Sequence, residues 1–410
     1  MPQNSTEVRS KKDQGKKKGK ASKPTEPKSR TSTPGQGQGS KDLKPSSGST
    51  TNPFSLELQQ QLLNLFKTSF SSSFSGQLSS ILQEIKGHLY KREFDRAFGS
   101  EEFLEAYAVR WSPSRALCYL SIFRAYLRDC VRKLERQSAA RDQAINPGNT
   151  VKDGELGQED CSTIVGSDQF KVTCLGGGGG AELVALAGWL AHRHSSSHVG
   201  AGSHNSENRL PISLSLIDIA DWSMVLKKLE TSIHATFCSG AGAEASEEPS
   251  ETSKLPLAPD KITLQFHQHD LLKMPVEDLQ PLIQGSHVIT LMFTLNELYS
   301  ASMGQTTKLL LQISSFLQKG VLLLVVDSPG SYSTVSVGDS QADTTQKKYP
   351  MHWLLDHTLL SDDEKKDRER GWRWEKLATN ESQWFRLPAE LKYPIGLEDM
   401  RYQAHLYRLE

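Results

Sequence analysis

Apolar residues three and four positions apart characterise the chain from Phe54 to about Gln137. This spacing places them on one face of a helix. In the stretch "WSPSRALCYLSIFRAYLRDCVRKLER", Ser112 is a suitable N-cap and Pro113 a suitable first helical residue. The sequence therefore predicts a helical domain over residues 53–137, in which one helix begins at Ser112.

A second pattern follows a polar linker at residues 138–167, where short apolar runs alternate with stretches of helical spacing. The strand-like runs are 171–175, 212–217, 262–266, 287–293 and 321–326, and the helical stretches are 181–193, 221–234 and 305–318. Such alternation is typical of a parallel sheet with helices on both faces. The C-terminal segments "SQWFRLP" and "MRYQAHLYRLE" predict a closing pair of strands. Polar inserts at 194–209, 239–259 and 328–348 are expected to be surface loops.

Charge is distributed unevenly along a chain whose formal net charge is zero. Residues 1–50 contain twelve Lys and Arg residues, four Asp and Glu residues, and almost no large apolar side chains. This composition predicts a disordered basic arm over residues 1–52. Such an arm fits a protein that works near polyanions such as nucleic acid, although a solubilising tail is the simpler alternative. The cluster "KKKGK" at 16–20 would suit nuclear import.

The cysteines and the apolar runs exclude several classes of protein. The five cysteines include no C-x-x-C pair, which argues against a zinc site or a disulfide framework and for a reducing compartment. No apolar run approaches the ~18 residues that a membrane span requires, and the N-terminus lacks the apolar segment of a signal peptide. We therefore expect a soluble intracellular protein that binds no metal and inserts into no membrane.

The segment "KVTCLGGGGGAE" places five glycines between a strand-like run and a helical stretch. In a strand–turn–helix unit, glycines allow a tight turn and a close approach of the backbone to a ligand. A phosphate-binding P-loop is excluded because no Gly-Lys-Ser/Thr follows. A dinucleotide fingerprint through Gly176, Gly178 and Ala181 fits as well as a methyltransferase motif through Gly176, Gly178 and Gly180. The glycines thus predict a nucleotide-type loop without naming its ligand.

Acidic residues end the next two strand-like runs. Asp218 lies where a carboxylate can accept hydrogen bonds from ribose hydroxyls, 38 residues beyond Gly180, or 22 when the polar insert is left out. Asp270 follows the third run, where an adenine amino group would be held. Either acid could instead cap the helix that follows it, and for Asp218 that helix would begin near Asp221. Together the two acids favour S-adenosylmethionine as the ligand.

The fourth strand-like run leads into "LMFTLNELYS". Its end should lie at the topological switch point beside the first strand, where ligands bind in open α/β sheets. Thr294, Asn296 and Glu297 are therefore expected to meet the transferred group or the substrate. The fifth run ends on Asp327.

From about Leu104 to Glu410 the chain resembles the fungal large-subunit rRNA uridine-N3 methyltransferases of the seven-strand class. The resemblance rests on "RWSPSRALCYLSIFR", "CLGGGGGAELVALAG", "LIDIADWS", "TLMFTLNELYS" and "YPIGLEDMRYQAHLYRLE". It implies a Rossmann-like seven-strand methyltransferase sheet in residues 168–410, with an antiparallel last strand, behind the helical domain and the basic arm. One departure is Cys174, which replaces the acid commonly found two residues before the first motif glycine. Glu182 could substitute for that acid, although a glutamate in the first turn of a helix is the simpler interpretation.

The resemblance implies transfer of a methyl group from S-adenosylmethionine to N3 of a uridine in rRNA. The cofactor-binding residues would be Gly176, Gly178, Gly180, Asp218 and Asp270. Because N3 carries a proton that must leave, a nearby carboxylate would help, with Glu297 as the candidate base and Asn296 as the group that orients the uracil. The partner would be large-subunit rRNA or a preribosomal particle in the nucleus or nucleolus, and we expect a monomer.

The arginines of the helical domain have two interpretations. Arg115, Arg124 and Arg128, with Trp111, could form a wall that grips RNA, while a solvated charged flank is the simpler alternative for the arginines that recur every four residues. Three other functions remain open. A protein methyltransferase would use the same cofactor site without needing the basic arm. An NAD-dependent dehydrogenase fits the glycines but not the C-terminal pair of strands, and a catalytically silent ribosome-assembly factor could keep the fold.

Overall fold

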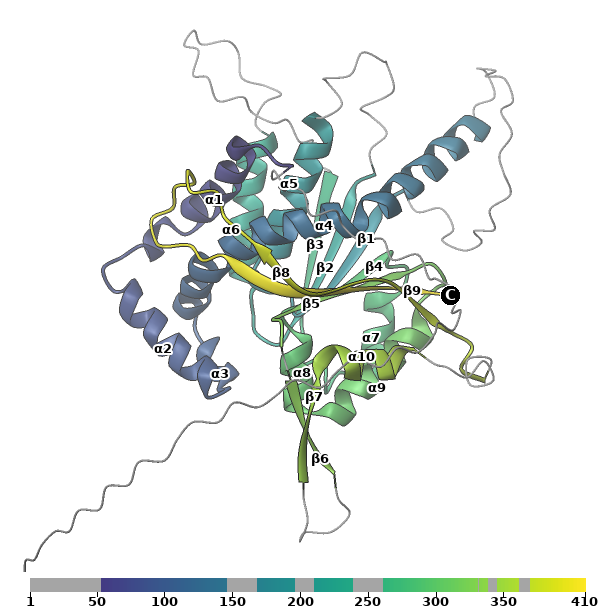
Figure 1. Cartoon of the computed structure of the whole chain (residues 1–410). Coiled ribbons are helices and arrows are strands. Elements are labelled where there is room, and N and C mark those ends of the chain that lie inside the picture. Colours follow the sequence, from purple (N-terminus) through teal and green to yellow (C-terminus); the bar gives the residue numbers. More distant parts are fainter. Residues whose placement is uncertain are drawn as a thin grey trace, which may run out of the picture. The chain divides into compact units, whose positions relative to one another are not determined.

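A seven-stranded sheet forms the centre of the computed structural model, which describes residues 53–145, 168–195, 210–238, 261–330, 332–337, 345–360 and 369–410 (Figure 1). Its strands are β1 (Phe170–Leu175), β2 (Ile212–Asp218), β3 (Ile262–Gln268), β4 (Val288–Met292), β5 (Leu322–Asp327), β8 (Trp374–Phe385) and β9 (Met400–Leu409). Their order across the sheet is β3-β2-β1-β4-β5-β9-β8. The first five are parallel, and β9 is antiparallel to both of its neighbours. The prediction of a seven-strand sheet with an antiparallel last strand is confirmed.

Helices cover both faces of the sheet (Figure 1). One face carries α1 (Leu56–Ser69), α4 (Glu101–Ile145), α5 (Ala181–Ser195) and α6 (Ser223–Ile233). The other carries α7 (Val276–Ile283), α8 (Leu295–Ala301), α9 (Met303–Phe316) and α10 (Met351–Leu359). Shorter elements are η1 (Ser71–Ser73), α2 (Leu78–Tyr90), α3 (Phe94–Ala97) and η3 (His234–Cys238). These helices and the sheet belong to one compact unit.

The central strands are mostly apolar because each faces a helical layer on both sides. All residues of β4 and β5 are buried. In β5, Leu322, Leu324 and Val326 join the core on the α4 face, while Leu323 and Val325 join the core on the α9 face. Continuous apolar runs of this kind are typical of parallel strands buried on both faces. The edge strand β8, in contrast, is exposed at most of its alternate positions.

The helix that contains Pro113 begins eleven residues before Ser112, at Glu101, so the predicted start at Ser112 is wrong. A proline inside a helix removes the hydrogen bond to the carbonyl four residues earlier, which here belongs to Val109. The hydroxyl of Tyr393 donates to this carbonyl at 3.0 Å. A residue 284 positions from Val109 thus supplies the missing donor. The helix α4 continues to Ile145, into the stretch expected to be linker.

The insert 328–348, expected to be a loop, contains strands instead. β6 (Tyr332–Val337) pairs with β7 (Thr345–Pro350) in a separate antiparallel two-stranded sheet. Val, Thr and Tyr, which favour strands, recur in the first of these segments and explain the pairing. The other two inserts lie largely outside the described residues, as do the basic arm and most of the linker.

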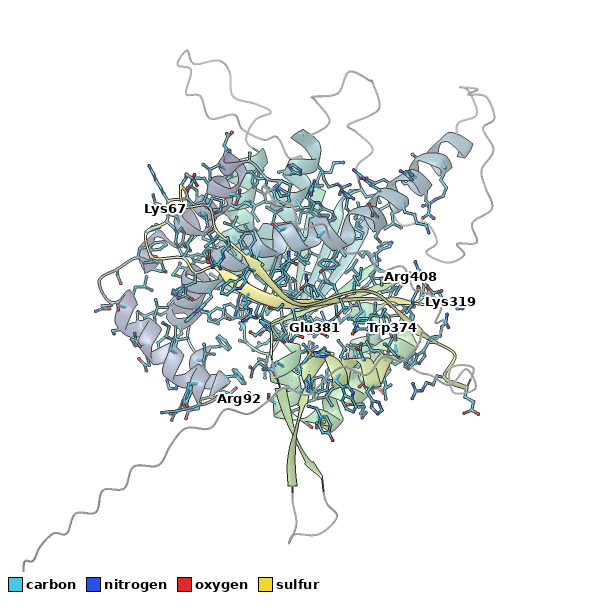
Figure 2. All side chains as sticks on the ribbon, viewed as in Figure 1. Lys67, Arg92, Lys319, Trp374, Glu381 and Arg408 are labelled. Atoms are coloured by element: carbon cyan, nitrogen blue, oxygen red, sulfur yellow. The ribbon has the colours of Figure 1, made fainter. Side chains whose placement is uncertain are left out.

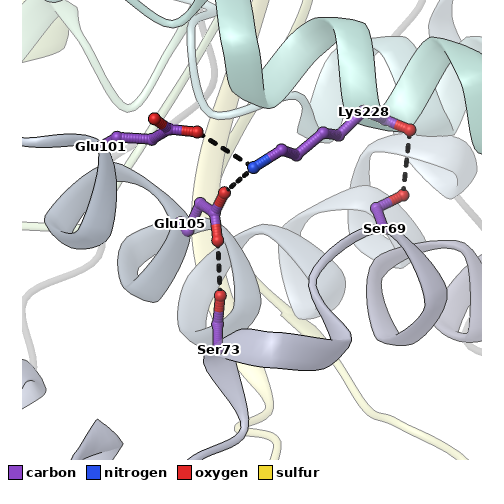
Figure 3. A network of polar contacts seen from close by, with 5 residues as sticks. All are labelled: Ser69, Ser73, Glu101, Glu105 and Lys228. Carbon is purple, nitrogen blue, oxygen red and sulfur yellow. Dashed lines mark hydrogen bonds and ion pairs between the residues drawn. The ribbon is translucent and has the colours of Figure 1, made fainter.

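A polar network ties the N-terminal helices to the layer that covers the sheet (Figure 3). Glu105 of α4 is buried, accepts a hydrogen bond from Ser73 Oγ at 2.7 Å and pairs with Lys228 of α6. Lys228 Nζ also lies 3.0 Å from Glu101. Its backbone carbonyl accepts a hydrogen bond from Ser69 of α1 at 3.2 Å. The network joins α1, η1, α4 and α6 and fixes where α4 crosses the sheet.

The start of β8 is anchored in the opposite layer. Trp374, labelled in Figure 2, is 2% exposed, and its Nε1 donates to Ser314 Oγ of α9 at 2.8 Å. Further along, β8 reaches the carboxyl edge of the sheet, where β5 ends. Among the described helices, none is both long enough and apolar enough to cross a membrane.

Candidate cofactor and substrate site

The glycine loop follows β1 at the carboxyl edge of the sheet. Gly176 and Gly180 have φ angles of 89° and 79°, which L-residues with side chains rarely adopt. At Gly178 a Cβ atom would lie 1.8 Å from the ring of Trp222, and at Gly176 it would lie 2.3 Å from Oγ1 of Thr294. The loop thus needs glycine at these positions because of its backbone angles and because of its neighbours within the chain.

Asp218 ends β2 beside this loop. Its Oδ2 accepts a hydrogen bond from the amide of Gly178 and its Oδ1 from the amide of Ala220, both at 3.1 Å. Burial raises the pKa of Asp218, while the two amide donors act against this shift. Asp218 does not cap the next helix, because α6 begins at Ser223 with Trp222 as its N-cap residue. Asp218 keeps acceptor capacity for ligand hydroxyls, because each carboxylate oxygen has two lone pairs.

Asp270 lies at the neighbouring strand end, where the amide of His269 donates to the backbone carbonyl of Asp218 at 2.8 Å. Both oxygens of its carboxylate have partners. Oδ1 accepts from the amide of Leu272 at 3.0 Å, and Oδ2 lies 2.8 Å from Lys273 Nζ. Residues 271–273 form a turn and not a helix, and α7 begins only at Val276 with Pro275 as its N-cap residue, so Asp270 caps no helix. The adenine-binding role of Asp270 stays a prediction.

The end of β4 carries an unusual backbone. Phe293 has a φ angle of 59°, the left-handed region that costs a bulky residue of the order of 1–3 kcal/mol. Such strain occurs mainly at sites where function requires a defined backbone. Here it turns the chain from β4 into α8, so that Thr294 lies against Gly176. The predicted pair Asn296 and Glu297 follows in the first turn of α8.

Asn296 and Glu297 have different surroundings. The side-chain oxygen of Asn296 is buried and has no hydrogen-bond partner among the described residues. Such an orphaned acceptor normally has a ligand or a water as its partner. The side chain of Glu297 is 42% exposed, and its Oε2 lies 3.9 Å from Nη2 of Arg92. Asn296 therefore offers a buried acceptor, and Glu297 offers an accessible carboxylate.

Asp327, which the sequence only marked as the end of a strand, connects these elements. It is 3% exposed and accepts hydrogen bonds from the amides of Asn296 at 3.0 Å and Ser328 at 2.7 Å. Burial raises the pKa of Asp327 to about 6, and the negative charge of Glu297 adds to the shift. Its position at a strand end was visible in the sequence, but its partners were not.

The middle of α4 forms the roof of the site. Ser112 Oγ donates to the carbonyl of Gly179 at 2.6 Å, which fixes the helix on the glycine loop. Nη1 of Arg115 donates to the hydroxyl of Tyr107 at 2.6 Å, and its guanidinium lies 5.3 Å from the ring centroid of Phe293. Arg115, proposed from the sequence as part of an RNA-binding wall, lies inside the site instead.

Glu182 lies in the region that the missing acid of β1 would occupy. It is 4% exposed, and its carboxyl carbon lies 3.5 Å from the position of a Cβ on Gly177, next to Cys174. Burial raises the pKa of Glu182 to about 7, and the charge of Asp218 adds to the shift, while Arg115 acts against it. Burial, and then Glu182, also raise the pKa of the Cys174 thiol. The position of Glu182 supports the idea that it substitutes for the missing acid.

The charges in the site fit a cationic ligand. Glu182, Asp218 and Asp327 are buried or partly buried, and Arg115 is the cation that acts on the first and the last of them. Burial by itself would lower the pKa of Arg115, but its neighbours, Tyr107 first, shift it upward. Burial is the main cause of the raised pKa values of these carboxyls, and a cation bound beside them would favour their charged form. S-adenosylmethionine has a sulfonium and an ammonium group, so the residues present fit this cofactor.

The order of the strands, the glycine loop after β1 and the acidic residues at the strand ends are together typical of one class of protein. This class is the Rossmann-like S-adenosylmethionine-dependent methyltransferases. Residues 66–408 match the model of a family described as "Putative SAM-dependent methyltransferase", and the chain belongs to this family. A curated relative from Saccharomyces cerevisiae, named 25S rRNA (uridine(2843)-N(3))-methyltransferase, is 29% identical over 361 residues, which are 85% of each chain.

Two solved structures illustrate the wider similarity. A SAM-dependent methyltransferase from Methanosarcina mazei is 9% identical with a TM-score of 0.31, and the match covers 59% of this chain and 93% of that one. One from Clostridium acetobutylicum is also 9% identical with a TM-score of 0.27, covering 71% and 97%. At these scores the likeness adds nothing to what the family match and the strand order establish. Among the described residues, no group of three His, Cys, Asp or Glu side chains is arranged to hold a metal ion.

Proposed function

We propose that this chain methylates N3 of a uridine in large-subunit rRNA, with S-adenosylmethionine as the methyl donor. The observation that carries the proposal is the match, over most of both chains, to a relative whose name states this activity. The geometry of the site supports it, because an orphaned acceptor and an accessible carboxylate lie next to the glycine loop. Ribosome biogenesis in the nucleus or nucleolus is part of the same proposal.

On the cofactor side, the bound S-adenosylmethionine would supply a methyl group that its sulfonium makes electrophilic. Asp218 would accept hydrogen bonds from the ribose hydroxyls, and the glycine loop would allow close approach of the nucleoside. Glu182 and Asp327 would contribute the negative charge that balances a cation in a site with little solvent. Ser112 holds the loop in place through the carbonyl of Gly179. Alignment of the two reacting atoms is then the main contribution of the protein.

On the substrate side, Glu297 is our candidate for the base that removes the N3 proton. Its exposure leaves it accessible to a nucleotide, and its Oε2 lies 3.9 Å from Nη2 of Arg92. Asp327 is less suited to this role because it is 3% exposed and therefore less accessible to a nucleotide. The side-chain amide of Asn296 would orient the uracil, whose edge presents both a donor and acceptors.

The target uridine must be unpaired or flipped out of its helix, because pairing hides N3. The aromatic side chains of Tyr107 in the roof and Phe293 at the end of β4 lie next to Arg115 and could hold an extruded base by stacking. A protein substrate would need neither an extruded base nor the basic arm. This difference separates the proposal from the protein-methyltransferase alternative.

The test combines the full-length protein, methyl-labelled S-adenosylmethionine and large-subunit rRNA, offered naked and as preribosomal particles. We expect label in RNA, recovered as 3-methyluridine after nuclease digestion. Label in ribosomal protein would favour a protein methyltransferase, and tight cofactor binding without transfer to either substrate would favour an assembly factor.

Glu297→Gln examines the catalytic assignment in the same assay. We expect unchanged cofactor affinity by calorimetry and a drop in kcat of about a hundredfold or more, a typical contribution of general base catalysis. Asp278→Asn, on α7, is the control for a charge change on the surface and should behave as wild type. Normal turnover of Glu297→Gln would remove Glu297 as the base without affecting the proposed activity.

A further inference from the structure

Trp384 is the penultimate residue of β8, and its side chain is 50% exposed. The guanidinium carbon of Arg386 lies 4.1 Å from its ring centroid, and that of Arg401 lies 5.8 Å away. An exposed aromatic ring offers a face on which a nucleic-acid base can stack. We call Trp384, Arg386 and Arg401 the Trp384 platform.

Both arginines of the platform are held in place by polar contacts. Nη1 of Arg386 lies 2.6 Å from Oδ2 of Asp399, and Nε of Arg401 donates to Ser382 Oγ at 2.9 Å. Arg386 holds the pKa of Asp399 below its usual value. A guanidinium has five N–H donors, so each arginine keeps several for a ligand. The platform therefore presents an accessible ring and two oriented cations, of which Arg386 is paired with Asp399.

The strand register places the platform at the edge of the sheet that carries the site. Asp327 at the end of β5 pairs with Gln403 of β9, and Trp384 of β8 pairs with Arg401, two residues further out. Two strand spacings and two residues along a strand amount to about 12 Å. The segment after β8 also contacts the roof helix, through Tyr393 to Val109. Nucleotides next to a bound target uridine would pass within this distance.

We propose that the Trp384 platform binds single-stranded RNA beside the methylation site, with one flanking base stacked on Trp384 and a phosphate held by Arg386 and Arg401. This inference rests on the proposed function for the identity of the RNA. Stacking on an aromatic ring tolerates any base, and arginines next to the ring suit the phosphates that follow it. The positive charge beside the ring favours RNA over an apolar protein segment as the occupant.

The chain contains a matched control. Trp353 on α10 is 46% exposed, almost as much as Trp384. Its ring already stacks with Tyr349 at 4.9 Å and with His357 at 5.2 Å. Among the described residues, no Lys or Arg lies over it. Trp353→Ala thus removes an exposed tryptophan that lacks the features of the platform.

The experiment measures binding of a fluorescein-labelled single-stranded oligouridine to the full-length protein by anisotropy. Trp384→Ala should raise Kd about tenfold or more, the usual effect of losing one stacked base, whereas Trp384→Phe should retain most of the affinity. Trp353→Ala should bind as wild type. Arg401→Gln should reduce the slope of log K against log salt by about 0.7, the value for one phosphate contact on a single strand. Calorimetry with S-adenosylmethionine should give the same Kd for all variants and so show that they are folded.

Three results would overturn the proposal. They are equal RNA affinity of wild type and Trp384→Ala, equal losses in Trp384→Ala and Trp353→Ala, and no RNA binding by the wild type at low salt. If Trp384→Ala keeps RNA binding but loses binding to a ribosomal protein, the Trp384 platform is a protein-binding surface and the proposal is wrong. Failure of the proposed function is distinguishable from these, because RNA binding can depend on Trp384 even if no 3-methyluridine forms.

Discussion

The two halves of α4 carry the same apolar spacing in different surroundings. Leu120 and Phe123 of the inner half, Glu101–Phe123, are fully buried, and so is Leu127 of the outer half, Arg124–Ile145. Judged by their apolar residues alone, the two halves are alike. The difference lies in what surrounds their polar residues.

In the inner half, Glu105 and Arg115 have specific partners. Glu105 pairs with Lys228, and Arg115 donates to Tyr107 within the site. In the outer half Arg132 and Arg136 are exposed, and no ion pair to either is present among the described residues. Burial, and then the neighbouring Arg128 and Arg132, lower the pKa of Arg124, because like charges four residues apart repel each other. The position of an arginine relative to the sheet edge, and not its spacing along the helix, therefore decides whether it belongs to the site.

The strongest test of this difference is the pair Arg115→Ala and Arg132→Ala. Arg115→Ala removes the donor to the Tyr107 hydroxyl and the positive charge that acts on Glu182 and Asp327. We expect the free energy of unfolding to fall by about 2 kcal/mol, the order for hydrogen bonds of charged groups. Arg132→Ala should change it by less than about 0.5 kcal/mol. Urea denaturation followed by circular dichroism measures both. Equal effects would contradict the division of α4 into two halves.

A pH titration of stability tests the raised pKa of Glu182, which lies beneath the inner half of α4. The folded-state pKa of Glu182 is about 7, above its ordinary value of 4.5. The folded protein therefore binds an extra proton between these values, so the free energy of unfolding should fall as pH rises from about 4.5 to about 7, by about 3 kcal/mol for this group. Glu182→Gln should flatten this dependence. An unchanged profile would show that Glu182 titrates normally in the folded state.

Asp218→Ala tests the loop that the inner half covers. It removes the acceptor for Gly178 and the proposed acceptor for ribose, so the affinity for S-adenosylmethionine should weaken by about 1.5–3 kcal/mol, or roughly ten- to hundredfold. Calorimetry measures this, with Asp221→Ala on the adjacent turn as control. Asp218→Ala is a cleaner variant than Gly178→Val, whose side chain would collide with Trp222. Full affinity in Asp218→Ala would remove the residue from the cofactor site.

Tyr393→Phe tests how the proline of the inner half is tolerated. Without the hydroxyl, the carbonyl of Val109 loses its donor, and we expect a loss of stability of about 1 kcal/mol. Tyr90→Phe provides the control, because this tyrosine is 92% exposed. If the two variants are equally stable, water replaces the Tyr393 hydroxyl without cost.

We expect the smallest effects on stability and cofactor affinity from substitutions in the outer half of α4. The double variant Arg132→Gln and Arg136→Gln should leave stability and cofactor affinity unchanged. If these arginines contact RNA phosphates, the slope of log K against log salt should fall by about 1.4, the value for two contacts on single-stranded RNA. An unchanged slope would leave them as a solvated flank. Deletion of residues 1–52 in the same assay would show whether the basic arm adds salt-sensitive affinity.

Much of the fold follows from local sequence. The buried strands are visible as apolar runs because parallel strands need apolar residues on both faces, and the glycine loop because its left-handed φ angles exclude other residues. Asp218 was identifiable by its place at a strand end. The strands of the 328–348 insert were missed because polar residues dominate that segment.

Only the tertiary structure decided the rest, because it depends on contacts between distant segments. The start of α4 could not be predicted from Ser112-Pro113. Pro113 is tolerated inside the helix because Tyr393, far along the chain, donates to the carbonyl that the proline leaves without a donor. Likewise, the roles of Arg115 and Asp327 follow from burial and from partners on other elements. The sequence by itself determined that a nucleotide-type loop follows the first strand. The tertiary structure determined which charges surround it, because only folding brings α4 over the carboxyl ends of β1, β4 and β5.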